Sequence, residues 1–189
     1  MRSHCALNII LIGMPGAGKS TVGVLLAKRL GYNFVDTDLL LQSQQESRLQ
    51  EIIAREGLEA FKSLEEQVLT GLTTTHSVVA TGGSAVYSER AMARLKKLGQ
   101  LVFIDIPLEE LRDRVNDMDS RGLVIGPNET YETLYRERLP LYQKYAEVTI
   151  SGSRLTVEAV AAEIENSVCG PDKQGNRDKN SNYVLRKIL

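Results

Sequence analysis

Cysteine is scarce in this chain, with only Cys5 and Cys169 near opposite ends of 189 residues. Neither has the close spacing of a metal-binding or redox pair, so we expect free thiols in a reducing cytoplasm, with a mutual disulfide as the alternative. The net charge is only −1 at pH 7, which argues against nucleic acid or membrane surfaces as partners. No apolar run approaches the length of a membrane span, and no signal peptide is recognisable.

The composition is that of one globular domain followed by a polar tail. Apolar residues make up 42% and charged residues 25% of the chain, which is ordinary for a compact protein with a substantial core. From residue 170 onward the sequence is polar. We therefore predict one domain over residues 1–169 and a tail over 170–189 that is mostly disordered up to about residue 182.

Strand-like and helix-like segments alternate along this domain. Apolar runs typical of short buried strands occupy residues 8–12, 32–35, 77–80, 101–106 and 147–150. Helical spacing of apolar residues occupies 20–30, 49–53, 61–72, 87–98, 107–115, 131–145 and 156–168. Residues 116–128 have no periodicity and are predicted to form a long loop. Such alternation predicts a parallel sheet with helices on both faces.

The segment GMPGAGKS at residues 13–20 matches the phosphate-binding pattern G-x-x-x-x-G-K-[ST] at every fixed position. A predicted strand precedes it and a predicted helix follows, which is the context that the pattern requires. Main-chain N–H groups of such a loop surround phosphates, and the helix start adds positive field. Lys19 would reach the β- and γ-phosphates, and the Ser20 hydroxyl would ligate Mg²⁺. A glycine turn that binds nothing is the alternative.

Acidic residues follow the second predicted strand, where ligands of such sheets bind. If the chain stays extended through Asp36-Thr37-Asp38, both carboxylates face the same side. One could then hold Mg²⁺ through water, while the other orients or deprotonates an attacking hydroxyl. A solvated turn or a helix cap is the alternative. After the third strand, Gly82 and Gly83 would allow close backbone approach to a ligand, although a plain turn explains them equally.

Two arginines could serve phosphoryl transfer. Arg121 lies in the long loop and Arg138 in the next predicted helix. A loop that carries an arginine can cover the γ-phosphate, exclude water and stabilise charge on the transferring group. From spacing alone, an ordinary surface arginine is the simpler interpretation.

Taken together, these motifs resemble the shikimate kinase family. The resemblance extends in order and intervals from residue 8 to about 168. It rests on residues 13–23, 26–27, 30–31, 34–38, 56–57, 61, 64–66, 81–83 and 138–142. It implies a three-layer α/β/α phosphate-loop kinase with a five-stranded parallel sheet and a mobile lid at about 116–128. It also implies a cytoplasmic monomer that uses ATP and Mg²⁺ to phosphorylate the 3-hydroxyl of shikimate, in aromatic amino acid biosynthesis.

The resemblance assigns the matching residues to three groups. The residues implied to bind ATP are Gly13, Gly16, Ala17, Gly18, Lys19, Ser20, Thr21, Arg114 and Arg154. Those implied to bind the acceptor are Asp38, Lys62, Gly82, Gly83, Ser84 and Arg138. Those implied in catalysis are Lys19, Asp38 and Arg121, and the Mg²⁺ ligands are Ser20 and Asp36.

Individual roles follow from the same resemblance. Asp38 contacts the acceptor hydroxyls as the candidate base, and Arg138 binds the acceptor carboxylate. Arg121 corresponds to the lid arginine that reaches the γ-phosphate. Arg114 lies over the adenine and Arg154 near the adenine loop.

Three positions depart from the family pattern. Lys62 stands where the family has arginine, which keeps the charge but loses the planar two-pronged grip on a carboxylate. Ser84 replaces a third glycine, and its side chain is expected to intrude on the pocket. Gly122 replaces a proline after Arg121 and makes the lid more pliable.

Lys62 and Ser84 are expected in the acceptor-binding site, and none of the three departures is expected in the ATP-binding site. Two alternatives to a shikimate kinase therefore stay open. A related kinase could use another hydroxylated acceptor, with gluconate kinases the nearest candidates. A catalytically silent protein could bind nucleotide and act through a partner.

Overall fold

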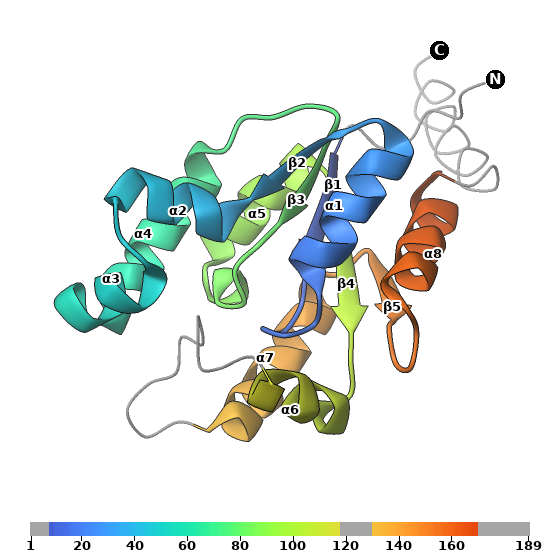
Figure 1. Cartoon of the computed structure of the whole chain (residues 1–189). Helices are drawn as coiled ribbons and strands as arrows, with labels where there is room; N and C mark the ends of the chain where they lie inside the picture. Colours follow the sequence, from blue (N-terminus) through green and yellow to red (C-terminus); the bar gives the residue numbers. More distant parts are fainter. Residues whose placement is uncertain (1–7, 118–129, 170–189) are drawn as a thin grey trace, which may run out of the picture.

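The computed structural model describes residues 8–117 and 130–169, which form a five-stranded parallel sheet flanked by helices (Figure 1). The strands are β1 (Asn8–Ile12), β2 (Asn33–Asp36), β3 (Ser77–Ala80), β4 (Gln100–Asp105) and β5 (Val148–Ser151). Their order across the sheet is β2-β3-β1-β4-β5, and all four pairings are parallel. In this register Ile10 of β1 lies between Val79 and Leu101.

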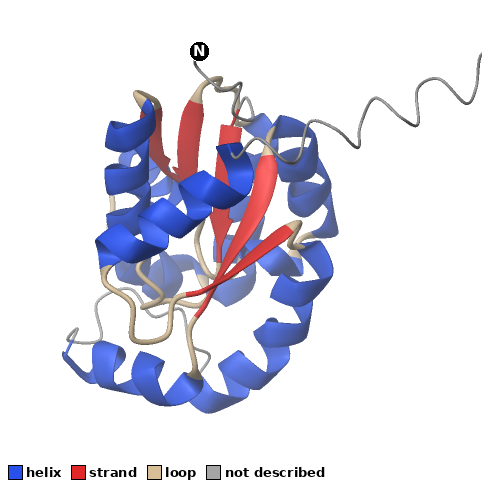
Figure 2. Cartoon of the chain, turned by 90° about the vertical axis from the view of Figure 1, so that its right-hand side faces the viewer, coloured by secondary structure: helices blue, strands red, loops and turns tan. Residues whose placement is uncertain are grey.

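Helices connect the strands and cover both faces of the sheet (Figure 2). They are α1 (Lys19–Leu30), α2 (Thr37–Gln45), α3 (Leu49–Glu56), α4 (Leu58–Gly71), α5 (Glu89–Leu98), α6 (Leu108–Asp117), α7 (Tyr131–Tyr145) and α8 (Val157–Cys169), with a 3₁₀ turn η1 (Ala85–Tyr87). Helix α1 packs against α8, and α4 packs against α5. The predicted three-layer α/β/α class with five parallel strands is confirmed.

The core forms around the central strand. Every residue of β1 is buried, and β4 is buried along most of its length. Because the parallel sheet is covered on both faces, its strands consist of continuous apolar runs rather than alternating ones. A smaller apolar cluster of Leu41, Leu49, Ile52 and Phe61 joins α2, α3 and α4. Leu49 and Phe61 of this cluster line the cavity described below.

Helix α2 was not predicted, and it corrects the extended interpretation of residues 36–38. Asp36 ends β2 with an extended backbone, and its Oδ1 accepts hydrogen bonds from the N–H groups of Asp38 (3.0 Å) and Leu39 (3.3 Å). Aspartate is among the strongest N-cap residues, and this cap turns the chain into a helix immediately after the strand. Asp36 therefore takes the capping role that the sequence offered as an alternative, while still lining the site.

Other boundaries differ from prediction by a few residues. Helix α6 continues to Asp117, two residues into the predicted loop, and the segment predicted as one helix from 87 is divided between η1 and α5. Ser88 causes that division, because its hydroxyl accepts from the Ala91 N–H and starts a new helix. The rest of the predicted lid and the tail at 170–189 lie outside the described residues.

Cys169 ends α8 and is disulfide-bonded, so the prediction of a free thiol there is wrong. Cys5 lies outside the described residues. Within the described part of the chain, no helix has the length and apolar character needed to cross a bilayer.

Candidate active site

A cavity of about 570 Å³ opens where β1, β2 and β3 end at their carboxyl edge. Its walls come from the glycine loop, the start of α1, helices α2, α3 and α4, the segment after β3, and α7. The sequence-predicted residues that line it are Gly16, Gly18, Lys19, Ser20, Thr21, Asp36, Asp38, Gly82, Gly83, Ser84 and Arg138. Gly13 and Ala17 belong to the loop but not to the cavity lining.

The glycine loop has the backbone of a phosphate cradle. Gly18 caps α1 with φ of 85°, a left-handed value that favours glycine. A side chain on Gly13 would come within 2.8 Å of the Ile104 carbonyl oxygen, so only glycine fits between the loop and β4. These two positions fix the turn that directs the first N–H groups of α1 toward the cavity.

Lys19 folds back onto the glycine loop. Its Nζ donates to the carbonyl oxygens of Gly13 (2.8 Å) and Met14 (2.9 Å). Burial lowers the pKa of Lys19 to about 8, although the carboxylates of Asp38 and Asp36 oppose that shift. A buried ammonium with only carbonyl partners gains from any anion placed beside it, which suits a phosphate-binding role.

Ser20 and Asp36 join the glycine loop to the end of β2. Ser20 Oγ donates to Asp36 Oδ2 at 2.6 Å, and both residues line the cavity. Mg²⁺ prefers hard oxygen ligands and uses one or two protein oxygens together with substrate phosphates. A hydroxyl and a carboxylate side by side next to a phosphate cradle therefore fit that ion.

Asp38 lies on the first turn of α2 and reaches into the cavity. Burial, together with the negative charge of Asp36, raises the pKa of Asp38 to about 6, while Lys19 opposes the shift. The carboxylate is still largely ionised at neutral pH and can accept a proton, which is the property required of a general base.

Glu65 is a buried carboxyl that sequence reasoning did not assign to the site. It is 4% exposed, and its Oε2 accepts a 2.6 Å hydrogen bond from Ser84 Oγ. Its Oε1 has no partner among the described residues. Burial raises the pKa of Glu65 to about 7. The available signal was its place on the apolar face of α4, four residues from both Phe61 and Leu69.

Gly82 separates Glu65 from Asp38. A β-carbon there would lie 2.2 Å from Glu65 Oε1 and 2.7 Å from Asp38 Oδ1. The glycine thus lets the two carboxyl groups face the same point. Ser84 lines the cavity, and its hydroxyl donates to the buried Glu65.

Arg138 and Lys62 share Tyr87 but differ in their access to the cavity. Arg138 is 2% exposed, its Nε donates to Tyr87 Oη at 3.1 Å, and its guanidinium carbon lies 5.1 Å from the ring centroid. Lys62 Nζ lies 5.2 Å from the same centroid and pairs with Glu59 Oε1 at 2.8 Å. Arg138 lines the cavity, whereas Lys62 does not. The role of Lys62 in acceptor binding stays a prediction.

Two tyrosines of α7 hold the loops around the cavity. Tyr131 Oη donates to the Pro15 carbonyl at 2.6 Å, and Tyr142 Oη donates to the Gly83 carbonyl at 2.7 Å. The first bond fixes the glycine loop and the second fixes the segment after β3. Neither tyrosine was assigned from sequence.

Three arginines were predicted to contact ATP: Arg114, Arg121 and Arg154. Arg114 and Arg154 do not line this cavity, and Arg121 is not among the described residues. Arg114 pairs with Glu110 at 3.6 Å, and the Arg154 N–H donates to the same carboxylate at 3.2 Å. The structure thus brings Arg114 and Arg154 to one acidic residue without placing either in the cavity lining. Arg121 lies outside the described residues.

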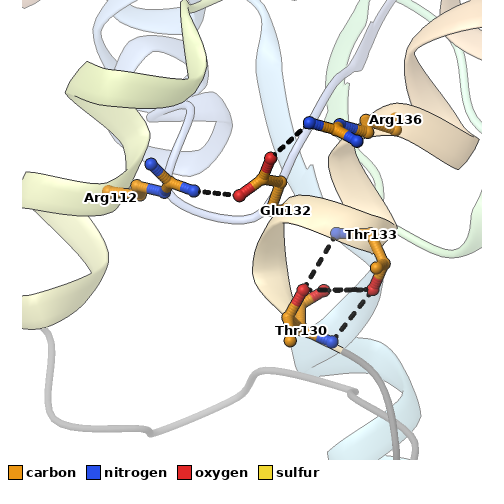
Figure 3. Close-up of polar contacts among 5 residues, drawn as sticks. All are labelled: Arg112, Thr130, Glu132, Thr133 and Arg136. Carbon is orange, nitrogen blue, oxygen red and sulfur yellow. Dashed lines mark hydrogen bonds and ion pairs between the residues drawn. The ribbon is translucent and has the colours of Figure 1, made fainter.

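An ion pair connects helices α6 and α7 (Figure 3). Glu132 of α7 binds Arg112 of α6 and also Arg136 one turn further along, at 2.6 Å. Thr130 starts α7 by accepting from the Thr133 N–H at 3.1 Å, and Thr133 Oγ1 accepts from the Thr130 N–H at 2.9 Å. The start of α7, which also carries Tyr131, is therefore fixed in place.

The buried lysine, the glycine cradle, the Ser20–Asp36 pair and the adjoining acidic pocket define a phosphate-loop small-molecule kinase. A sequence model of the shikimate kinase family matches residues 15–169. The shikimate kinase of Thermobifida fusca is 38% identical over 154 residues, covering 80% of this chain and 89% of that protein. The shikimate kinase of Mycobacterium leprae is 33% identical over 194 residues, covering 96% of each.

A solved structure of shikimate kinase from Acinetobacter baumannii, in complex with shikimate, is similar with a TM-score of 0.81 and 31% identity. The match covers 88% of this chain and 95% of that one. The chain belongs to the shikimate kinase family.

Proposed function

We propose that this chain transfers the γ-phosphate of ATP to the 3-hydroxyl of shikimate, with Mg²⁺ as the metal ion. The observation that carries the proposal is one cavity lined by a phosphate loop, by the candidate base Asp38 and by the buried cation Arg138. The A. baumannii relative, whose structure contains shikimate, supports the choice of acceptor.

The nucleotide side of the cavity holds the phosphates. Main-chain N–H groups of the glycine loop and of the α1 start surround them, and the buried Lys19 ammonium neutralises their charge. Ser20 and Asp36 would hold Mg²⁺, which when bound shields charge on the β- and γ-phosphates.

The acceptor side orients and activates the hydroxyl. Arg138 binds the acceptor carboxylate and Asp38 receives a hydrogen bond from the reacting hydroxyl. The hydroxyl oxygen forms the new bond to the γ-phosphorus while the bond from that phosphorus to the ADP oxygen breaks. The hydroxyl proton passes to Asp38, whose pKa of about 6 keeps it ionised and ready at neutral pH.

Cellular context and assembly belong to the same proposal. We infer a cytoplasmic enzyme, because the reaction consumes ATP, and a monomer, because the family resemblance implies one. Size-exclusion chromatography with light scattering tests the monomer.

A product analysis tests the proposed reaction. Purified protein, MgATP and shikimate are incubated, and ³¹P NMR follows a new phosphate monoester whose proton coupling locates it on the ring 3-position. The proposal predicts that this signal grows with time and is absent from Asp38→Asn. A monoester that forms on gluconate but not on shikimate would favour the related kinase with another acceptor.

A further inference from the structure

The acceptor carboxylate needs positive charge, and few cations face it. Among the described residues that line the cavity, the cationic side chains are Lys19, Arg48 and Arg138. Lys19 is bonded to the carbonyls of the phosphate loop, and Arg138 is anchored on Tyr87. Lys62 pairs with Glu59 and does not line the cavity. Arg48 is therefore the cation on the cavity wall whose guanidinium is available for a carboxylate.

Local structure gives no reason for arginine at position 48. The residue is the N-cap of α3, where Ser, Thr, Asp and Asn are preferred because their side chains accept hydrogen bonds from the first N–H groups. Arginine has no acceptor atom, and its side chain makes no capping bond here. Its positive charge is also unfavourable at the positive end of a helix. A residue that breaks local preferences at a cavity wall is expected to serve function.

Arg48 is exposed, and its guanidinium is not committed to a described acidic neighbour. Its main-chain N–H donates to Glu51 Oε2 at 2.9 Å, and the Arg48 charge helps to lower the pKa of Glu51, after the hydrogen bonds from Arg48 and Ser47. The guanidinium itself forms no salt bridge with Glu51 or any other described residue. The next arginine of α3, Arg55, is instead paired with Glu56 at 2.7 Å and lies outside the cavity lining.

We propose that Arg48 is the second cation that binds the acceptor carboxylate, reaching it from α3 while Arg138 reaches it from α7. This inference rests on the proposed function and assigns to Arg48 a task that the family resemblance implied for Lys62. Its planar guanidinium restores the two-pronged grip that lysine lacks.

Charge-specific kinetics test the assignment. Steady-state KM and kcat are measured for wild type, Arg48→Gln, Arg48→Lys and the control Arg55→Gln, with shikimate and with its uncharged methyl ester. Calorimetric titration of shikimate into each protein with MgADP gives affinity without turnover. The expected result for Arg48→Gln is an about tenfold rise in KM and Kd for shikimate. KM for ATP, kcat and the ester kinetics should stay within about twofold, and Arg48→Lys should be intermediate.

Two results overturn the inference. One is that wild type is active and Arg48→Gln has the same KM for shikimate. The other is that Arg48→Gln raises KM equally for shikimate and for its methyl ester. A large rise in Lys62→Gln with none in Arg48→Gln would return the task to Lys62. A wild type that neither binds nor phosphorylates shikimate would overturn the proposed function as well, so the two failures are distinguishable.

Discussion

Ser84 Oγ lies 2.6 Å from Glu65 Oε2 and donates its hydrogen to it inside the protein. The other oxygen of this carboxyl, Oε1, has no partner among the described residues. Ser84, in the segment after β3, thus supports the buried carboxyl of Glu65 in α4. Gly82 lies between that carboxyl and Asp38.

Replacing Ser84 with alanine should destabilise the protein more at pH 8 than at pH 5. At pH 8 the ionised Glu65 loses its one described donor, which costs about 1–3 kcal/mol. At pH 5 the carboxyl is protonated and depends less on that donor. Urea unfolding at both pH values measures the difference. The control is Ser63→Ala, which changes an exposed serine of α4, the helix that carries Glu65. It should change stability by less than about 0.5 kcal/mol. Equal losses for Ser84→Ala at both pH values would contradict this interpretation.

The raised pKa of Glu65 predicts a pH-dependent stability. Its pKa is about 7 in the folded protein, from an ordinary value of 4.5, so between these values the folded state holds a proton that the unfolded chain has released. Stability therefore falls as pH rises through that interval, and Asp38, with its pKa raised to about 6, adds in the same direction. Glu65→Gln should flatten the dependence of the unfolding free energy on pH. Its unfolding free energy should exceed that of wild type by about 1–3 kcal/mol at pH 8, with little gain at pH 5. Parallel curves for the two proteins would argue that Glu65 titrates normally.

Removing the Ser20 hydroxyl should weaken metal use without unfolding the protein. Ser20→Ala loses the group that bonds to Asp36 Oδ2, while the cap from Asp36 Oδ1 to α2 remains. We expect an about 10- to 100-fold higher Mg²⁺ concentration for half-maximal activity. Because Ser20 is exposed, Tm without ligand should shift by only a few degrees. An unchanged Mg²⁺ dependence would remove Ser20 from the metal site.

Tyr131→Phe should affect ATP more than the acceptor. The change removes the 2.6 Å hydrogen bond to the Pro15 carbonyl and loosens the glycine loop. A neutral hydrogen bond is worth about 0.5–1.5 kcal/mol, so KM for ATP should rise about threefold to tenfold while KM for shikimate changes less. Tyr135→Phe, one turn along α7, is the matched control because no described residue bonds to its hydroxyl. Identical KM values for ATP in both variants would show that the Pro15 bond does not matter.

The fold was predictable because its signals are local. The apolar run before Gly13 and the helical spacing after Lys19 indicate a strand, turn and helix, and all three are present. The boundary at Asp36 was harder, since an aspartate after a strand can continue the strand or cap a helix. Only the hydrogen bonds to Asp38 and Leu39 decide between these outcomes.

The site was only partly predictable, because side-chain partners come from distant segments. The family resemblance implied Lys62 for the acceptor, and only the structure shows that its ammonium pairs with Glu59, one turn away on the same helix. Glu65 is separated from Ser84 by 19 residues, and their hydrogen bond depends on how α4 packs behind the loop after β3. No spacing rule within one helix reveals such a contact.

The most direct test of the whole account is shikimate-dependent release of ADP. Purified protein is assayed with MgATP and increasing shikimate, against a blank without acceptor and a gluconate control. We predict saturable turnover with shikimate, with the blank and gluconate near background. ATP binding without any shikimate-dependent ADP release would contradict the proposed function and would mean that the acceptor pocket serves another hydroxylated molecule.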